Sequence, residues 1–175
     1  PPARRVLNEA DVHVWRAGLD QPEWVLLHLG RLLSDDERAR ADRFRFDRDR
    51  QRFIVCRGVL RMILSGYLDI APSQLQFRYS PQGKPALSAL HGNDLRFNLS
   101  NSEGLAVYAV TRHREVGIDL EYLRPMPDAA ALAGRFFSKR ENVMWRALSS
   151  DRKPEAFFNC WTRKEAFVKA LGDGM

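Results

Sequence analysis

Three carboxylates and one lysine stand at positions in the sequence where they could form a reactive site. Asp119 and Glu121 are two residues apart in "VGIDLEYL", and Glu165 and Lys169 are four residues apart in "WTRKEAFVKAL". The period of a strand turns the first two side chains to one face, beside Gly117, which would leave room for a ligand, and the period of a helix places the other two on adjacent turns. Carboxylate oxygens suit magnesium and a lysine neutralises phosphate charge, so these residues indicate a site for a metal-bound phosphate.

Each of these patterns also has an ordinary explanation. A half-exposed strand can turn its acidic residues to solvent, and a Glu–Lys pair at this spacing is a common helix-surface feature, worth only about 0.2–0.5 kcal/mol. Neither explanation covers Lys164, which falls in the middle of the apolar arc that Phe157, Trp161, Val168 and Leu171 would form on the same helix. The position of Lys164 within this apolar arc therefore requires another explanation.

Two further segments carry polar residues that could contact a ligand. In "QGKPAL", Lys84 lies in a turn between Gly83 and Pro85, and "NLSNS" supplies hydrogen-bonding side chains at the end of a strand, including Ser100 and Asn101. The histidines show no metal-ligand spacing, and the chain contains no GxSxG elbow, Walker loop or GxGxxG motif.

Composition limits the kind of protein that carries these residues. The chain has 175 residues, of which 45% are hydrophobic and 29% charged, which is typical of a globular protein with one large or two small domains. No apolar run approaches the roughly 18 residues of a membrane span, and the N-terminus lacks the apolar core of a signal peptide, so we expect a cytoplasmic protein. Cys56 and Cys160 have no metal-site or CxxC spacing, and we expect buried, reduced thiols.

The net charge of +6 comes largely from arginine. Nine arginines lie in the segment from Glu37 to Arg61. This segment could be a solvated helix face, or it could be a surface that binds phosphates or an acidic protein. Charge alone does not separate these interpretations.

Strand and helix patterns alternate along the chain, and they would position these residues. Periodicity predicts strands over 12–19, 75–80, 94–100, 105–113 and 115–123, with a short turn at 100–104 between two of them. Helices are predicted from the Ser34–Glu37 capping box, over 49–68, from Asp128, from the Ser138–Glu141 capping box, and from Pro154.

The motifs together carry a resemblance to a known family. "GKPAL", "FNLSNSEG", "VGIDLE", "FFSKRE" and "WTRKEAFVKALGDG", in this order, make residues 33–175 similar to the 4′-phosphopantetheinyl transferases of the surfactin-synthetase (Sfp-like) type. The resemblance implies an α/β (α+β) pseudo-dimer of two similar halves, residues 1–113 and 114–175. It also implies transfer of the phosphopantetheine arm of coenzyme A to a serine of a carrier protein, with release of adenosine 3′,5′-bisphosphate.

The resemblance also implies roles for individual residues. Asp119, Glu121 and Glu165 would hold Mg²⁺ against the pyrophosphate of coenzyme A, and Asp119, Glu165 and Lys169 would be catalytic. Glu165 would help to deprotonate the carrier serine, and Lys169 would assist the departing oxygen. The residues expected to contact coenzyme A are Arg40, Arg52, Lys84, Pro85, Ser100, Asn101, Lys164 and Lys169.

The partners implied are coenzyme A and an acidic acyl or peptidyl carrier protein, with no nucleic acid and no membrane, and the protein is expected to be a monomer. Asn101 stands where the family usually has histidine, and the family continues for several strands beyond the position of Met175, so the second half would be incomplete. One alternative is a non-catalytic relative that binds carrier protein or coenzyme A. Another is a basic nucleic-acid-binding module, but the chain lacks the interleaved aromatic platform such a module needs.

Overall fold

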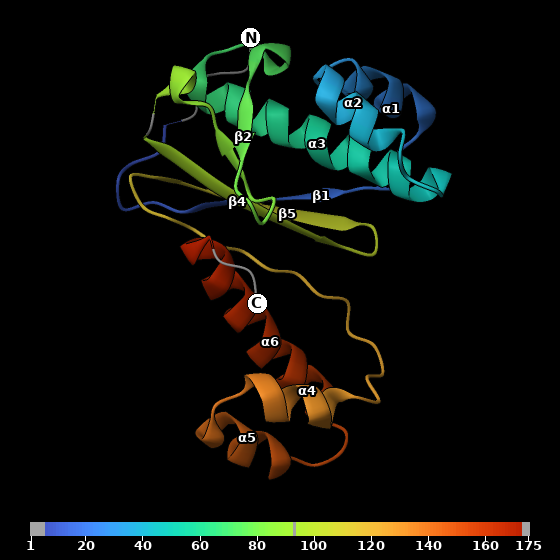
Figure 1. Ribbon diagram of the computed structural model, residues 1–175, viewed down its shortest axis with the longest axis vertical. Coiled ribbons are helices and arrows are strands. Elements are labelled where there is room, and N and C mark those ends of the chain that lie inside the picture. The colour runs from blue at the N-terminus through green and yellow to red at the C-terminus, as the bar shows by residue number, and fades with distance from the viewer. Residues whose placement is uncertain (1–5, 93, 173–175) are drawn as a thin grey trace.

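The computed structural model describes residues 6–92 and 94–172 and divides into two units, shown in Figure 1. In the upper unit, helices lie over one face of an antiparallel sheet. The lower unit consists of three helices, one of which rises to the other face of the sheet. The mixed α/β fold class predicted from the sequence is confirmed.

The sheet of the upper unit has the strand order β1-β5-β4, with antiparallel pairing throughout. These strands are β1 (His13–Gly18), β4 (Leu95–Ser102) and β5 (Leu105–Arg112). The predicted turn between β4 and β5 is present, and Glu103 and Gly104 form it with positive φ angles. A separate two-stranded sheet pairs β2 (Phe77–Tyr79) with β3 (Pro85–Leu87).

Three helices complete the upper unit: α1 (Glu23–Gly30), α2 (Asp35–Ala41) and α3 (Asp47–Leu68). The predicted capping box of Ser34 and Glu37 begins α2. Helix α3 buries Cys56, Leu60 and Leu64 against the sheet, as its periodicity predicts. Two short 3₁₀ turns, η1 (Pro72–Gln74) and η2 (Ala89–His91), follow it.

The lower unit consists of α4 (Ala129–Phe136), α5 (Lys139–Arg146) and α6 (Lys153–Leu171). The capping box of Ser138 and Glu141 begins α5, and a proline lies in the first turn of α6, both as predicted. A second hydrophobic cluster, centred on Phe157, holds these helices together. Within the described residues, no helix is both long and apolar enough to cross a membrane.

The strand predicted over 115–123 is wrong. This segment is extended, but it forms no backbone ladder with any residue that the structure describes, and side chains of β4 hold it instead. The Ile118 N–H donates to Asn98 Oδ1 at 2.9 Å, and the Tyr122 N–H donates to Ser102 Oγ at 3.1 Å. The period-two pattern correctly indicated an extended backbone, but a strand also requires a neighbouring backbone at pairing distance, which the pattern cannot supply.

The prediction that Gly117 leaves room for a ligand is also wrong, because α6 fills that space. A Cβ atom at this position would lie 1.8 Å from the Ala166 carbonyl oxygen and 2.6 Å from the Ala170 nitrogen. The absence of a side chain at Gly117, together with two alanines one helical turn apart, lets the extended segment contact the backbone of α6. This contact brings Asp119 of the segment beside Lys169 of the helix.

Candidate active site

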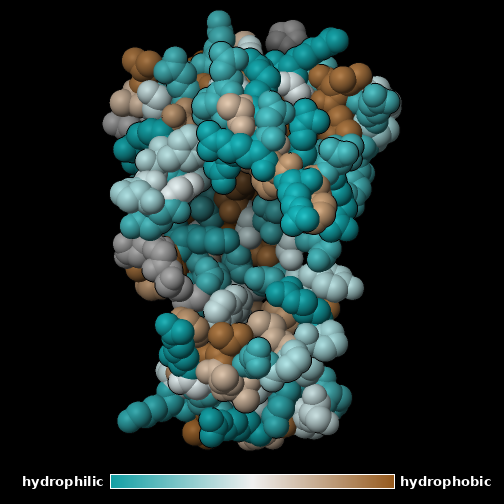
Figure 2. All heavy atoms as spheres, turned by 45° about the vertical axis from the view of Figure 1, so that its right-hand side comes forward, coloured by the Kyte–Doolittle hydropathy of each residue, from teal (hydrophilic) through white to brown (hydrophobic). Residues whose placement is uncertain are grey.

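A cavity of about 710 Å³ lies where α3, the β2–β3 turn, the β4–β5 turn and α6 meet. The space-filling view shows the upper part of the molecule hollowed, with hydrophobic residues at the floor of the hollow and hydrophilic residues around it (Figure 2). Seven of the residues assigned from the sequence line this cavity: Arg40, Arg52, Lys84, Pro85, Asn101, Glu165 and Lys169.

Asp119 and Lys169 form the centre of the charged cluster next to this cavity. Lys169 Nζ donates to Asp119 Oδ1 at 2.6 Å and to Ser100 Oγ at 3.0 Å, and Ser100 Oγ donates to the same Asp119 oxygen at 2.9 Å. The Asp119 side chain is only 6% exposed, and its other oxygen, Oδ2, is buried without a hydrogen-bond partner in the described part of the chain. A buried carboxylate oxygen without a partner is costly unless a cation or a donor reaches it.

Glu165 lies close enough to the other carboxylates to be affected by their charge. Burial raises the pKa of Glu165 first, and the negative charges of Asp119 and Glu121 raise it further, whereas Lys169 lowers it. Glu121 is also 3.4 Å from the guanidinium of Arg124. Across residues 6–92 and 94–172, no three side chains of the metal-binding types lie together closely enough to hold an ion as they stand.

The donor chemistry of this cluster nevertheless fits magnesium. All three candidate ligands are carboxylates, one of their oxygens is buried and unpaired, and their mutual repulsion favours a cation between them. To share one ion, Glu121 and Glu165 would have to lie closer to Asp119 than they do among the described residues.

Arg52 forms one wall of the cavity, and Asp20 holds it in place. Its Nε and Nη2 atoms donate to the two carboxylate oxygens of Asp20 at 2.7 and 2.9 Å, and Glu103 is 3.8 Å away. These hydrogen bonds lower the pKa of Asp20. Gly104 makes room for the pair, because a Cβ atom there would be 2.6 Å from Asp20 Oδ2.

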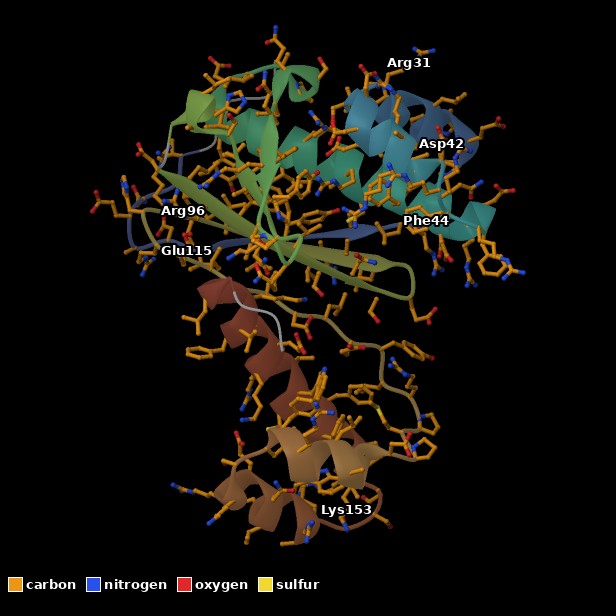
Figure 3. The ribbon with its side chains drawn as sticks, viewed as in Figure 1. Arg31, Asp42, Phe44, Arg96, Glu115 and Lys153 are labelled. Carbon is orange, nitrogen blue, oxygen red and sulfur yellow. The ribbon has the colours of Figure 1, made fainter. Side chains whose placement is uncertain are left out.

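Arg40 and two phenylalanines, Phe44 and Phe53, line the same stretch of the cavity wall. The Arg40 guanidinium lies over the ring of Phe53, 5.4 Å from its centroid, and Phe44 packs against the same ring at 5.3 Å. Figure 3 labels Phe44 near the start of α3. This part of the cavity therefore combines positive charge with aromatic surface.

Lys84 connects the β2–β3 turn to the end of α6. Its Nζ donates to the Ala170 carbonyl oxygen at 3.2 Å and lies 3.4 Å from Glu115. Glu115 also pairs with Arg96 at 2.8 Å, and these two side chains point toward one another from the segment after β5 and from β4 (Figure 3). Lys84 thus lines the cavity and also anchors α6.

Lys164 lies elsewhere, and its position explains why a lysine occurs in the apolar arc. Its Nζ is 2.9 Å from Glu141 and 6.0 Å from the centroid of the Phe137 ring, and it lines a groove between α5 and α6. A lysine can lay its aliphatic stem on apolar groups while its ammonium reaches a carboxylate. This arrangement lends no support to the expected contact between Lys164 and coenzyme A. The pKa of Glu141 is lowered to about 2 by its hydrogen bonds to Lys164 and to the Ser138 backbone.

Sequence reasoning missed several residues that build the cavity. Arg57 and Tyr79 line it, and Asp20 orients its arginine wall. A signal for Arg57 was present in the sequence, because Arg57 and Arg61 fall beside Cys56 and Leu60 on the apolar side of α3, as Lys164 falls on the apolar side of α6.

Both cysteines are free, as expected. Cys56 is buried and Cys160 is only partly so.

Comparison with known proteins gives one consistent family. Residues 115–175 match the 4′-phosphopantetheinyl transferase superfamily, and residues 15–113 match the N-terminal part of 4′-phosphopantetheinyl transferases. The chain is 49% identical over 176 residues to the 4′-phosphopantetheinyl transferase HetI of Nostoc sp. strain PCC 7120, covering all of this chain and 74% of HetI.

Two other relatives are more distant. AcpT of Salmonella typhi is 40% identical over 112 residues, which are 64% of this chain and 56% of AcpT. Sfp of Bacillus subtilis strain 168 is 30% identical over 143 residues, which are 82% of this chain and 62% of Sfp. The chain thus spans between about half and three quarters of the length of these relatives. On these matches and this site, the chain belongs to the 4′-phosphopantetheinyl transferase superfamily.

Proposed function

We propose that this chain carries the coenzyme A site of a 4′-phosphopantetheinyl transferase. The reaction moves the phosphopantetheine arm of coenzyme A to a serine of an acyl or peptidyl carrier protein and releases adenosine 3′,5′-bisphosphate. The observation that carries the proposal is the cavity itself, in which Glu165 and Lys169 face the same space as Arg40 and Arg52. Membership of the family supports the same conclusion.

Different residues of the cavity have different roles in this reaction. Arg40, Arg52 and Lys84 neutralise phosphate charge along the cavity, and Asn101 can donate its amide N–H groups there. Glu165 lines the cavity beside Lys169, and its carboxylate accepts the proton of the carrier serine. Lys169 stabilises the departing phosphate oxygen and supplies a proton to it.

Mg²⁺ belongs to this proposal as the ion that Asp119, Glu121 and Glu165 would hold. When bound, it supplies charge neutralisation at the pyrophosphate of coenzyme A. Lys169 now contacts Asp119 Oδ1, so we expect this lysine to turn from the carboxylate to phosphate when substrate binds.

The finer identity of the protein also remains a proposal. The identity to HetI is higher than the identity to Sfp, so a surfactin-synthetase type of carrier preference gains no support over another type. The acidic carrier, the division into residues 1–113 and 114–175, the monomeric state and the cytoplasmic location stay predictions from the sequence.

The test is to incubate the chain with an apo-carrier protein, coenzyme A and Mg²⁺, and to measure the mass of the carrier. Addition of one phosphopantetheine group supports transfer. A carrier of unchanged mass, together with calorimetric binding of coenzyme A, would instead identify a non-catalytic relative. Binding of neither coenzyme A nor carrier would contradict both functions.

A further inference from the structure

A buried set of charges beneath the cavity does not balance. Glu37, Arg57 and Arg61 are 1%, 5% and 0% exposed, so two positive charges share one negative charge inside the protein. Glu37 Oε1 accepts from Arg57 Nε at 3.0 Å, and Glu37 Oε2 accepts from Arg61 Nε at 2.6 Å. Burial of an unpaired charge is unfavourable, so the excess positive charge calls for an anion.

Arg61 is directed entirely toward the protein. Besides Glu37, its Nη1 donates to the carbonyl oxygens of Pro72 at 2.8 Å and Leu75 at 2.9 Å, and its Nη2 donates to Ser34 Oγ at 2.9 Å. Its guanidinium thus ties α3 to η1 and to the start of α2, and it does not line the cavity. The role of Arg61 is structural.

Arg57 differs from Arg61 in one respect that matters. Its Nε donates to Glu37 and its Nη2 donates to the Tyr79 hydroxyl, but its Nη1 has no hydrogen-bond partner within the described ranges. Arg57 lines the cavity, whereas Glu37 does not. Nη1 is thus the nitrogen of this almost fully buried guanidinium that is left for a ligand in the cavity.

We propose that Arg57 is a phosphate-binding residue of the cavity, and that Glu37 and Tyr79 position it. This inference rests on the proposed function, since it assigns a further contact to the phosphate groups of coenzyme A. A guanidinium whose Nε and Nη2 edges are already held loses little freedom when phosphate binds its remaining edge. The negative charge of phosphate also balances the buried excess.

Tyr79 strengthens the same site. Its hydroxyl accepts the hydrogen bond from Arg57, so its own proton is available to a second acceptor, and Tyr79 lines the cavity as well. Burial raises the pKa of Tyr79, although Arg57 lowers it, so the hydroxyl keeps its proton at neutral pH. Phosphate would thus meet two adjacent donors from α3 and β2.

The matched variants Arg57→Gln and Arg61→Gln test this inference. Each variant loses one guanidinium bound to Glu37, but only Arg57→Gln removes a guanidinium whose residue lines the cavity. Binding of coenzyme A and of inorganic pyrophosphate is measured by calorimetry, and folding by circular dichroism and thermal unfolding. We expect Arg57→Gln to weaken binding about 10- to 100-fold, as for one lost charge-assisted hydrogen bond, and Arg61→Gln to change it by less than about twofold.

A second pair of variants covers the case in which an arginine variant does not fold. Tyr79→Phe should weaken pyrophosphate binding about threefold to tenfold, as for one lost neutral hydrogen bond, whereas Tyr122→Phe, outside the cavity, should leave it unchanged.

Equal affinities in Arg57→Gln and wild type, or in Tyr79→Phe and Tyr122→Phe, would overturn the inference while leaving the proposed function intact. Binding of pyrophosphate through Arg57 without binding of coenzyme A would overturn the proposed function alone. A wild-type chain that binds neither ligand would overturn both.

Discussion

At the scale of single residues, the candidate site depends on charges placed where water reaches them poorly. Asp119 is the clearest example, because one of its oxygens contacts Lys169 and Ser100 and the other is buried without a partner. Such an atom is unfavourable in the free protein and favourable once a cation binds it. The same reasoning applies with the opposite sign to Arg57 and a bound phosphate.

A substitution at Asp119 tests whether its carboxylate binds a cation. Asp119→Asn keeps the shape of the side chain but removes its charge, so we expect transfer to fall about 10²- to 10³-fold, as is typical when a group that stabilises developing charge is lost. Turnover is measured by carrier mass at limiting Mg²⁺. Asp128→Asn, on an exposed residue before α4, is the control. Near-native turnover of Asp119→Asn would contradict its assignment as a metal ligand.

At the scale of elements, α6 is the part that joins the two units. Its N-terminal half packs on α4 and α5 through Phe157, and its C-terminal half contacts the extended segment at Gly117 and receives Lys84 from the β2–β3 turn. Glu165 and Lys169 lie in that second half. The geometry of the site therefore depends on how closely α6 approaches the segment.

A methyl group at Gly117 should disrupt this approach. Gly117→Ala places a Cβ atom against the backbone of α6, which cannot turn aside as a side chain can, so we expect a loss of at least about 1–3 kcal/mol in the free energy of unfolding and loss of most transfer activity. Gly134→Ala in α4 is the matched control, because nothing lies within 4 Å of its added Cβ atom. Urea unfolding of both variants measures the difference, and equal stabilities would contradict the close contact described here.

The ion pair between Glu141 of α5 and Lys164 of α6 should contribute to stability in a pH-dependent way. The folded-state pKa of Glu141 is about 2, below its ordinary value of 4.5, so its stabilising contribution is complete above about pH 4.5 and is lost as the pH falls toward 2. Because the side chain is 37% exposed, solvent screening limits its contribution, and Glu141→Gln should cost about 1 kcal/mol at neutral pH.

Urea unfolding from pH 7 down to pH 3 would measure this effect. The difference between wild type and Glu141→Gln should stay constant down to about pH 4.5 and shrink below it. Glu155→Gln, in the exposed first turn of α6, serves as the control. A difference that stays the same at every pH would mean that the charge of Glu141 contributes nothing.

At the scale of the whole molecule, the positive charge gathers around the cavity. The net charge is +6, and Arg40, Arg48, Arg52 and Arg57 all line the cavity. Such a surface attracts anions over distances set by the Debye length, about 8 Å at physiological ionic strength. This charge supports the proposed binding of phosphate groups in the cavity, and it is the basis for the prediction of an acidic carrier protein.

Salt should therefore weaken the association with a carrier protein. We expect KM for an acidic carrier to rise with salt, and the rise to be less steep in Arg45→Ser, which removes an exposed charge outside the cavity. Arg146→Ser, at the end of α5, is the control of equal charge change. Initial rates from low to high salt provide the measurement, and a carrier KM that does not change with salt would show that the basic surface serves another purpose.

Features that depend on residues close together in the chain were predictable from the amino-acid sequence. Both capping boxes and the α3 periodicity act within a few residues, so Ser34, Ser138 and the apolar face of α3 were predictable. The spacing of Glu165 and Lys169 likewise requires only a helix.

Other features of the fold and the site depend on residues far apart in the sequence, and only the tertiary structure set them. It placed Glu141 of α5 beside Lys164, filled the space at Gly117 with α6, and left residues 115–123 unpaired with any strand in 6–92 or 94–172. It also brought Arg57, Glu37 and Tyr79 together, because pairing and burial are set by chain segments that no local pattern specifies.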